Sequence, residues 1–200
     1  MTQIRKVGVI GAGNMGSGIA QKFAQEGIHV VMVDMKDEYV ARGLDTIRTM
    51  LEEAVQRKIV TNQQSEEILS RVQGATDYGA VADADLVIEA VFEDKQVKSD
   101  VFRKLDEVCR PETILATNTS SFYVREFGRQ TSRPERFIGL HYFYHPAKNR
   151  LLEVIPFEDT SEETVEKSLL AAKLHGKTPI VVKDAPGFAV NRFFVPFLNE

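Results

Sequence analysis

Three observations in the sequence predict an α/β protein built on a doubly wound, mostly parallel sheet. Residues 4–10 form a short, β-branched apolar run, which is typical of a buried parallel strand. A glycine-rich turn and an apolar helical pattern follow directly, up to Gly27. Strand-like and helix-like segments then alternate along most of the 200 residues, which indicates βαβ units. With 43% hydrophobic residues, the chain can bury a sizeable core.

The glycine-rich turn fits the pattern G-x-G-x-x-G and predicts a Rossmann-type dinucleotide site. Gly11 allows the tight strand-to-helix turn, Gly13 removes a Cβ where a pyrophosphate approaches, and Gly16 lets the helix pack close to the strand. The helix N-terminus offers N–H groups to the phosphates. The cofactor-binding residues expected here are Gly11, Ala12, Gly13, Asn14, Met15 and Gly16.

Asp34 directly follows the second apolar strand, residues 28–33, and lies about 20 residues beyond the glycines. At this position in Rossmann folds, a carboxylate accepts the hydroxyls of the adenosine ribose. Because its charge would repel a 2′-phosphate, the sequence predicts NAD rather than NADP. The alternative is that Asp34 only caps a helix or lies in a solvated loop.

Two helical patterns then interrupt the alternation. Apolar residues recur at steps of three and four from about residue 37 to residue 58, and Thr61 with Gln64 matches a capping box that opens a second helix. We expect a helical hairpin that protrudes from the core. Its basic residues Arg57 and Lys58 are candidates for binding a substrate phosphate, although exposed charges on helices are often only solvated.

Polar residues follow the later strands at their carboxyl ends, where ligands bind in open parallel sheets. Glu93 comes after the apolar run 84–92, and residues 117–121 are five small polar residues after the strand 113–116. A helix cap with a turn is the alternative for this second group. The next two strands, residues 137–140 and 151–155, carry His141 at the end of one and Glu153 inside the other. Because a buried carboxylate needs a partner, we expect Glu153 to pair with His141.

The C-terminal part completes the alternation. Thr160 with Glu163 matches a second capping box, which would open a helix through His175. The last strand is expected over residues 178–182, and Phe188 begins an apolar helix.

Composition excludes several classes of protein. The net charge of −4 leaves no broad basic face for a nucleic acid, and no apolar run approaches the roughly 18 residues of a membrane span. The single cysteine, Cys109, excludes an intrachain disulfide and fits a reducing compartment. The N-terminus reads as a strand, not as a signal peptide. We therefore expect a soluble cytoplasmic protein without a metal site.

Taken together, these motifs resemble the NAD-binding domain of the (S)-3-hydroxyacyl-CoA dehydrogenase family, which includes 3-hydroxybutyryl-CoA dehydrogenases. The resemblance covers essentially the whole chain. The segments that carry it are residues 11–20, 85–90, 118–121, 139–141, 152–154 and 186–192.

The resemblance implies a role for each matching position. His141 corresponds to the general base that takes the proton from the 3-hydroxyl of the substrate, and Glu153 to the carboxylate that orients its imidazole. Ser120 and Asn191 correspond to the donors that position the substrate oxygen and acyl group. The remaining cofactor contacts implied are Glu93, Lys98, Asn118 and, again, Ser120.

Two features depart from the family pattern. The histidine is normally followed by two aromatic residues and then Asn-Pro, whereas this chain has Tyr144 where the cofactor-contacting asparagine is expected, and then His145. His145 either replaces that contact or only packs the loop. The second feature is length. Residues 1–185 correspond to the NAD-binding domain, and 186–200 to the first helix of an all-helical domain that forms a homodimer.

The phenylalanines of this last helix would be left uncovered, so the resemblance implies a fragment that binds NAD but turns over acyl-CoA poorly. The implied activity is the reversible NAD-dependent oxidation of a (S)-3-hydroxyacyl-CoA to a 3-oxoacyl-CoA, as in fatty-acid β-oxidation or butyrate-type metabolism. A relative that oxidises a free hydroxy acid, or a non-catalytic NAD-binding protein, are the alternatives.

Overall fold

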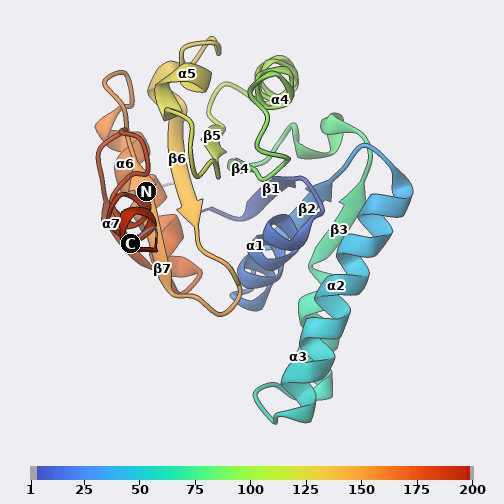
Figure 1. Cartoon of the computed structure of the whole chain (residues 1–200). Coiled ribbons are helices and arrows are strands. Elements are labelled where there is room, and N and C mark those ends of the chain that lie inside the picture. Colours follow the sequence, from blue (N-terminus) through green and yellow to red (C-terminus); the bar gives the residue numbers. More distant parts are fainter. Residues whose placement is uncertain (1–3, 199–200) are drawn as a thin grey trace.

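The strands of the computed structural model form a single eight-stranded sheet in the order β3-β2-β1-β4-β5-β6-β7-β8 (Figure 1). The structure describes residues 4–198, with side chains to residue 194. The strands are β1 (Lys6–Ile10), β2 (His29–Val33), β3 (Val72–Ala75), β4 (Leu86–Glu89), β5 (Ile114–Thr117), β6 (Phe137–Tyr142), β7 (Leu151–Ile155) and β8 (Thr178–Val181). The α-helices are α1 (Asn14–Gln25), α2 (Asp37–Gln56), α3 (Asn62–Ser70), α4 (Lys95–Val108), α5 (Val124–Gly128), α6 (Glu162–Leu174) and α7 (Val190–Leu198).

The first six strands run parallel in the order 3-2-1-4-5-6 that is typical of a doubly wound dinucleotide-binding sheet. This confirms the predicted fold class. The strand order reverses between β1 and β4, and ligands bind beyond the carboxyl ends of the strands at such a switch point. Strand β7 is antiparallel to β6, and β8 is parallel to β7.

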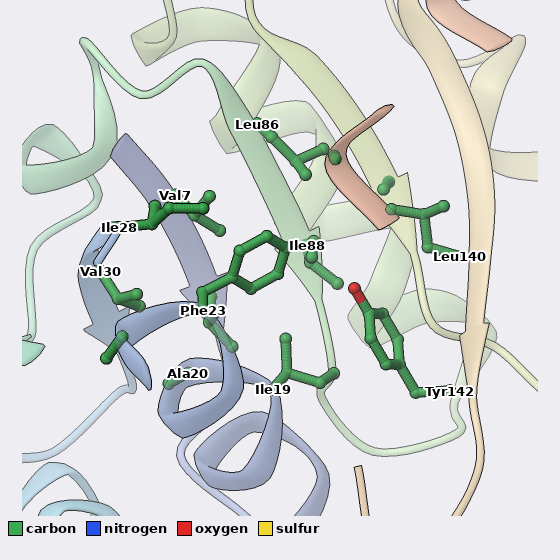
Figure 2. Packing of buried hydrophobic residues seen from close by; sticks show 14 of the residues in the cluster. Val7, Ile19, Ala20, Phe23, Ile28, Val30, Leu86, Ile88, Leu140 and Tyr142 are labelled. Carbon is green, nitrogen blue, oxygen red and sulfur yellow. The ribbon is translucent and has the colours of Figure 1, made fainter. Parts of the chain in front are cut away.

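Helices cover both faces of the sheet. One face is packed by α1, α2, α3 and α6, and the other by α4 and α5. Helix α1 lies at the centre of the first layer. Its apolar side chains are completely buried against β1, β2 and β4 (Figure 2). The ring of Phe23 inserts between this helix and the sheet. Burial of a side chain of this size contributes about 1.5–3 kcal/mol.

The helical hairpin is less separate from the core than the sequence predicted. Thr61 and Gln64 form the expected capping box at the start of α3. However, Ile47 and Leu51 of α2 and Ile68 of α3 belong to the same buried cluster as α1. Only the far end of the hairpin extends away from the sheet (Figure 1).

Helix α6 begins one residue later than the second capping box predicted. Ser161 is the N-cap and accepts the N–H of Thr164. The hydroxyl of Thr160 instead donates to the carbonyl of Phe137 and accepts the N–H of Phe157, which fastens the β7–α6 connection to β6. Helix α5, which the sequence did not predict, follows β5 and covers β6.

Among the residues described, no helix combines the length and the apolar character needed to cross a membrane.

Candidate active site

The glycine turn between β1 and α1 has the geometry that the sequence predicted for binding a pyrophosphate. Gly11 has a φ of +105°, and a Cβ there would lie 2.5 Å from the carbonyl oxygen of Ala90. A Cβ on Gly16 would lie 1.8 Å from the carbonyl oxygen of Gly11, so only glycine allows α1 to start this close to β1. A Cβ on Gly13, in contrast, would meet nothing within 4 Å. The open side of the turn therefore lies at Gly13.

The N-terminus of α1 is free to bind an anion. Gly13 is its N-cap, and no side chain caps it within the described chain. Asn14 is exposed, and Met15 is half-buried. Backbone N–H groups at a helix N-terminus carry a partial positive charge and bind phosphate without any side chain. The residues of this turn thus fit the pyrophosphate of a dinucleotide.

Asp34 lies next to this turn at the carboxyl end of β2. Its Oδ2 accepts the N–H of Ala12 at 2.7 Å, and its Oδ1 accepts the N–H of Met35 at 2.7 Å. These bonds fix the carboxylate beside the glycine turn, where Rossmann folds place the acidic residue that accepts the hydroxyls of the adenosine ribose.

His141 and Glu153 meet across the antiparallel pair β6–β7. They are directly paired residues in the strand register, and Nδ1 of His141 lies 2.6 Å from Oε2 of Glu153. Both side chains are buried. Phe143 and Phe188 flank the imidazole, with ring centroids 4.6 Å and 5.6 Å from it. The apolar walls limit solvent around the pair, which strengthens its electrostatic interaction.

A second group gathers at the ends of β4 and β5. Oε1 of Glu93 accepts hydrogen bonds from the Thr119 hydroxyl at 2.5 Å, the Ser120 N–H at 3.0 Å, and the N–H and hydroxyl of Ser121 at 3.2 Å and 2.7 Å. Glu93 therefore holds the segment 119–121 in place and leaves Ser120 exposed at its tip. Burial opposes ionisation of Glu93, but the Thr119 hydroxyl and the nearby Lys98 outweigh it and lower its pKa.

The family resemblance implies that Lys98 contacts the cofactor directly. In the structure, its side chain is instead buried behind residues 119–121. Its side chain is only 1% exposed, and its ammonium lies 2.6 Å from Oε1 of Glu89 and 3.1 Å from Oε2 of Glu93. Glu89 also accepts the hydroxyl of Thr117 at 2.7 Å and the N–H of Val91 at 2.8 Å. Burial raises the pKa of Glu89, and the Lys98 ammonium counteracts that rise. Glu89 and Glu93 therefore share the buried ammonium of Lys98.

The polar residues after β5 and β6 are also connected. Asn118 accepts the N–H of Tyr142 through its side-chain oxygen at 2.9 Å, which joins the ends of the two strands. Beyond Tyr142, the chain turns over Pro146, which packs on Gly18 of α1. The ammonium of Lys177 holds this loop by donating to the carbonyls of Pro146 and Asn149. Tyr144 is exposed, and its ring faces that of His145 at 3.9 Å.

Asn191, the second residue of α7, is half-buried. Its neighbour Val190 donates its N–H to Oε1 of Glu153 at 2.9 Å, so the start of α7 lies directly against the His141–Glu153 pair.

Two expected substrate contacts lie elsewhere. Arg57 and Lys58 are exposed at the end of α2, and that helix of 20 residues begins three residues after Asp34. Such a helix spans about 30 Å. The structure therefore does not bring them together with His141. Cys109 is buried, and burial raises the pKa of its thiol to about 11. The described residues contain no cluster of side chains suited to a metal ion.

Sequence reasoning missed two parts of this site. Glu89 lies inside the predicted apolar run 84–92, and only the position of Lys98, nine residues later on α4, could have signalled a pair. The two backbone donors to Glu153, from Ala189 and Val190, leave no signature in side-chain identity.

Comparisons with known proteins agree with this geometry. Residues 6–185 match the family model described as "3-hydroxyacyl-CoA dehydrogenase, NAD binding domain". The chain is 42% identical over 195 residues to a probable 3-hydroxybutyryl-CoA dehydrogenase of Deinococcus radiodurans, covering 98% of this chain and 70% of that protein. It is 40% identical to the fatty acid oxidation complex subunit alpha of Vibrio campbellii, covering all of this chain but only 28% of that subunit.

Among solved structures, the (S)-3-hydroxybutyryl-CoA dehydrogenase of Ralstonia eutropha superposes with a TM-score of 0.97 at 38% identity, over 98% of this chain and 70% of that one. These matches identify the chain as an NAD-binding domain of an enzyme family. The chain belongs to the 3-hydroxyacyl-CoA dehydrogenase family, and NAD is its cofactor.

Proposed function

We propose that this protein uses NAD to oxidise a (S)-3-hydroxyacyl-CoA to a 3-oxoacyl-CoA, reversibly, with His141 as the general base. The observation that carries the proposal is the 2.6 Å contact between Nδ1 of His141 and Oε2 of Glu153 at the carboxyl end of β6. A buried base held by a carboxylate is the arrangement that general-base catalysis requires.

In this proposal the two ring nitrogens of His141 have different tasks. Nδ1 carries a proton and donates a hydrogen bond to the carboxylate of Glu153. Nε2 therefore keeps its lone pair and takes the proton of the substrate hydroxyl. The negative charge of Glu153 then stabilises the imidazolium that forms. Bound NAD would accept the hydride that leaves C3 of the substrate, the carbon that bears the hydroxyl group. In the reverse direction, His141 returns the proton to the carbonyl oxygen.

Ser120 and Asn191 would position the substrate. Ser120 is exposed at the tip of the segment that Glu93 holds, and Asn191 follows the residue that donates to Glu153. Both side chains can donate a hydrogen bond to a substrate oxygen. Asn118, Glu93 and Ser120 would also line the nicotinamide end of the cofactor site, whereas Lys98 would act through Glu93.

Arg57 and Lys58 remain candidates for the phosphates of the coenzyme A moiety. If they bind it, the double substitution Arg57→Glu and Lys58→Glu raises KM for an acyl-CoA at least fivefold and leaves the affinity for NAD unchanged. An unchanged KM would remove them from the site.

We also infer that residues 186–200 begin a second structural unit through which the protein forms a homodimer in the cytoplasm. Two observations support this inference. Phe193 and Phe194 of α7 are 80% and 56% exposed, and the lone thiol of Cys109 is buried and suits a reducing compartment. A chain extended beyond residue 200 should then be dimeric in sedimentation and turn over acyl-CoA faster than the 200-residue chain. Equal turnover and a monomer in both would refute this part.

The main proposal is tested with His141→Gln. The matched control is His29→Gln, because His29 is exposed at the amino end of β2, whereas His141 lies near the carboxyl end of β6. With NAD and (S)-3-hydroxyacyl-CoA substrates from four carbons upward, His141→Gln should lower kcat by a factor of about 10³ or more. Its dissociation constant for NAD should stay within twofold of the parent. A comparable loss of NAD affinity would mean that His141 is structural, and faster turnover of the free 3-hydroxy acids would favour the alternative substrate class.

A further inference from the structure

The carboxylate of Glu153 is held from two sides. Oε2 faces Nδ1 of His141, while Oε1 accepts the N–H groups of Ala189 and Val190, each with an N to O distance of 2.9 Å. The side chain is completely buried, so these partners take the place of water. Backbone donors of this kind stabilise an ionised carboxylate.

Both donors come from a turn with an unusual backbone. We call residues 186–190 the α7 turn. Gly187 has a φ of +73°, and Phe188 has a φ of +46°, a conformation that is uncommon for a bulky side chain and costs about 1–3 kcal/mol. The N–H of Phe188 donates to the carbonyl of Ala185, and the N–H of Arg192 donates to the carbonyl of Gly187. This backbone path aims two successive N–H groups at Glu153.

Contacts with α5 and with His141 also hold the α7 turn in place. Just before it, Asp184 accepts the N–H groups of Val124 and Arg125 at 2.8 Å and 3.1 Å, which anchors the chain to α5. Within the turn, the side chain of Phe188 is buried against the imidazole of His141. The same five residues therefore contact the base through Phe188 and its carboxylate partner through two amides.

We propose that the α7 turn is a positioning element for catalysis, which sets the orientation and the effective charge of Glu153 and so couples the position of helix α7 to the basicity of His141. This inference rests on the proposed roles of His141 and Glu153. With one donor removed, more of the negative charge of Glu153 remains unbalanced, and the imidazolium opposite it is held more strongly. The carboxylate is also freer to rotate away from Nδ1.

A purely structural role makes a different prediction. If Glu153 only capped α7, loss of an N–H donor would lower the stability of the protein and leave the pH dependence of the reaction unchanged. If the α7 turn tunes the base, the pH profile itself moves. The pH profile therefore separates the two roles.

The direct test replaces Val190 by its α-hydroxy acid, which changes the amide to an ester and removes this single N–H without altering any side chain. The matched control places the same ester at position 192, because the Arg192 N–H donates to Gly187 and not to Glu153. We expect the ester at 190 to lower kcat about tenfold and to move the acid limb of the kcat/KM profile upward by at least half a pH unit. The control should leave that limb within 0.2 pH unit, and KM for NAD should not change in either.

A second variant covers the case in which the ester at 190 does not fold. Val190→Pro removes the same N–H, and proline is well accepted at the first position of a helix. It should move the acid limb in the same direction. If both variants behave like the ester at 192, the inference is wrong. If His141→Gln retains the turnover of the parent, the proposed function itself fails, whatever the esters do.

Discussion

The imidazole of His141 and the carboxylate of Glu153 are brought together by strand register, because the two residues are direct partners in the antiparallel pair β6–β7. Side chains of such partners start about 4.5–5.5 Å apart at Cβ and project from the same face of the sheet. The pair therefore needs no loop to position it, and a shift of one residue in register would separate it completely.

We predict that Glu153→Gln lowers kcat roughly 10²- to 10⁴-fold with little change in the dissociation constant for NAD. The amide oxygen must accept the N–H groups of Ala189 and Val190, so the amide nitrogen faces Nδ1. This arrangement forces the imidazole proton onto Nε2, where the base needs a free lone pair. Steady-state kinetics and NAD titration measure the two effects.

The control for this substitution is Glu163→Gln, which removes an exposed carboxylate of α6 that pairs with Lys167. Its kcat should match that of the parent. A kcat for Glu153→Gln within twofold of the parent would show that the carboxylate does not orient the base.

The sequence predicts those parts of the fold and site that depend on local patterns. The glycine turn, Asp34 and the alternation of most strands and helices follow from residue types at short spacing. A charge inside an apolar run must find a partner, which predicts that Glu153 pairs with His141. In the structure the two are indeed partners.

Features that depend on long-range packing were not predictable in this way. Helix α5 has only five residues, too few to show a helical period. Thr160 and Ser161 both suit an N-cap, and only contacts with Phe137 and Phe157 decide between them. Lys98 lies on an amphipathic helix, where a lysine normally reads as exposed, and its burial depends on Glu89 from another element.

The glycines of the nucleotide turn should separate folding from cofactor binding. Gly16→Ala would place a methyl group 1.8 Å from the carbonyl oxygen of Gly11, so the free energy of unfolding should fall by about 3 kcal/mol. Gly13→Ala meets nothing within 4 Å, and its unfolding free energy should change by less than about 1 kcal/mol. Its dissociation constant for NAD should nevertheless rise at least tenfold, because the methyl group occupies the approach of the pyrophosphate.

Urea unfolding without NAD, combined with NAD titration of the folded variants, tests this pair. If Gly13→Ala binds NAD like the parent, the pyrophosphate does not approach the backbone at Gly13.

The buried pair of Lys98 and Glu89 should stabilise the site only as a unit. Lys98→Met leaves Glu89 buried without its cation, and we expect the free energy of unfolding to fall by about 3–5 kcal/mol. The double variant Glu89→Gln with Lys98→Met removes both charges and should recover more than half of that loss. Urea unfolding of the parent, of the single variants Lys98→Met and Glu89→Gln, and of the double variant measures the coupling. Additive losses in the double variant would show that the two charges do not depend on each other.

Loss of the same cation should also loosen the segment that Glu93 holds. In the double variant, amide hydrogen exchange at Ser120 and Ser121 should be at least tenfold faster than in the parent, because Glu93 loses the ammonium 3.1 Å away. Exchange at Val30 in β2 serves as the internal reference. Unchanged exchange at the two serines would mean that Glu93 needs no help from Lys98.

His175 makes the stability of this fold sensitive to acid. It lies beside the end of α6, where Nδ1 is 2.5 Å from the carbonyl oxygen of Ala171 and Nε2 is 2.9 Å from the hydroxyl of Tyr142. Its ring also stacks on Phe23, with centroids 4.0 Å apart. Burial, aided by the charges of Lys177 and Lys22, lowers the pKa of His175 to about 3, against 6.5 for a free histidine.

Between these two values the unfolded chain binds a proton at position 175 and the folded protein does not, so stability is lost as the pH falls through this window. From pH 7 to pH 5 the loss due to His175 should be about 2 kcal/mol. His175→Gln is less stable at pH 7, because it loses the stacking on Phe23, but it takes up no proton. Its deficit relative to the parent should therefore shrink by about 2 kcal/mol at pH 5 in urea unfolding. His29→Gln, at an exposed histidine, should show no such change. A deficit that stays constant between pH 7 and pH 5 would mean that His175 is protonated in the folded protein as readily as in the unfolded chain.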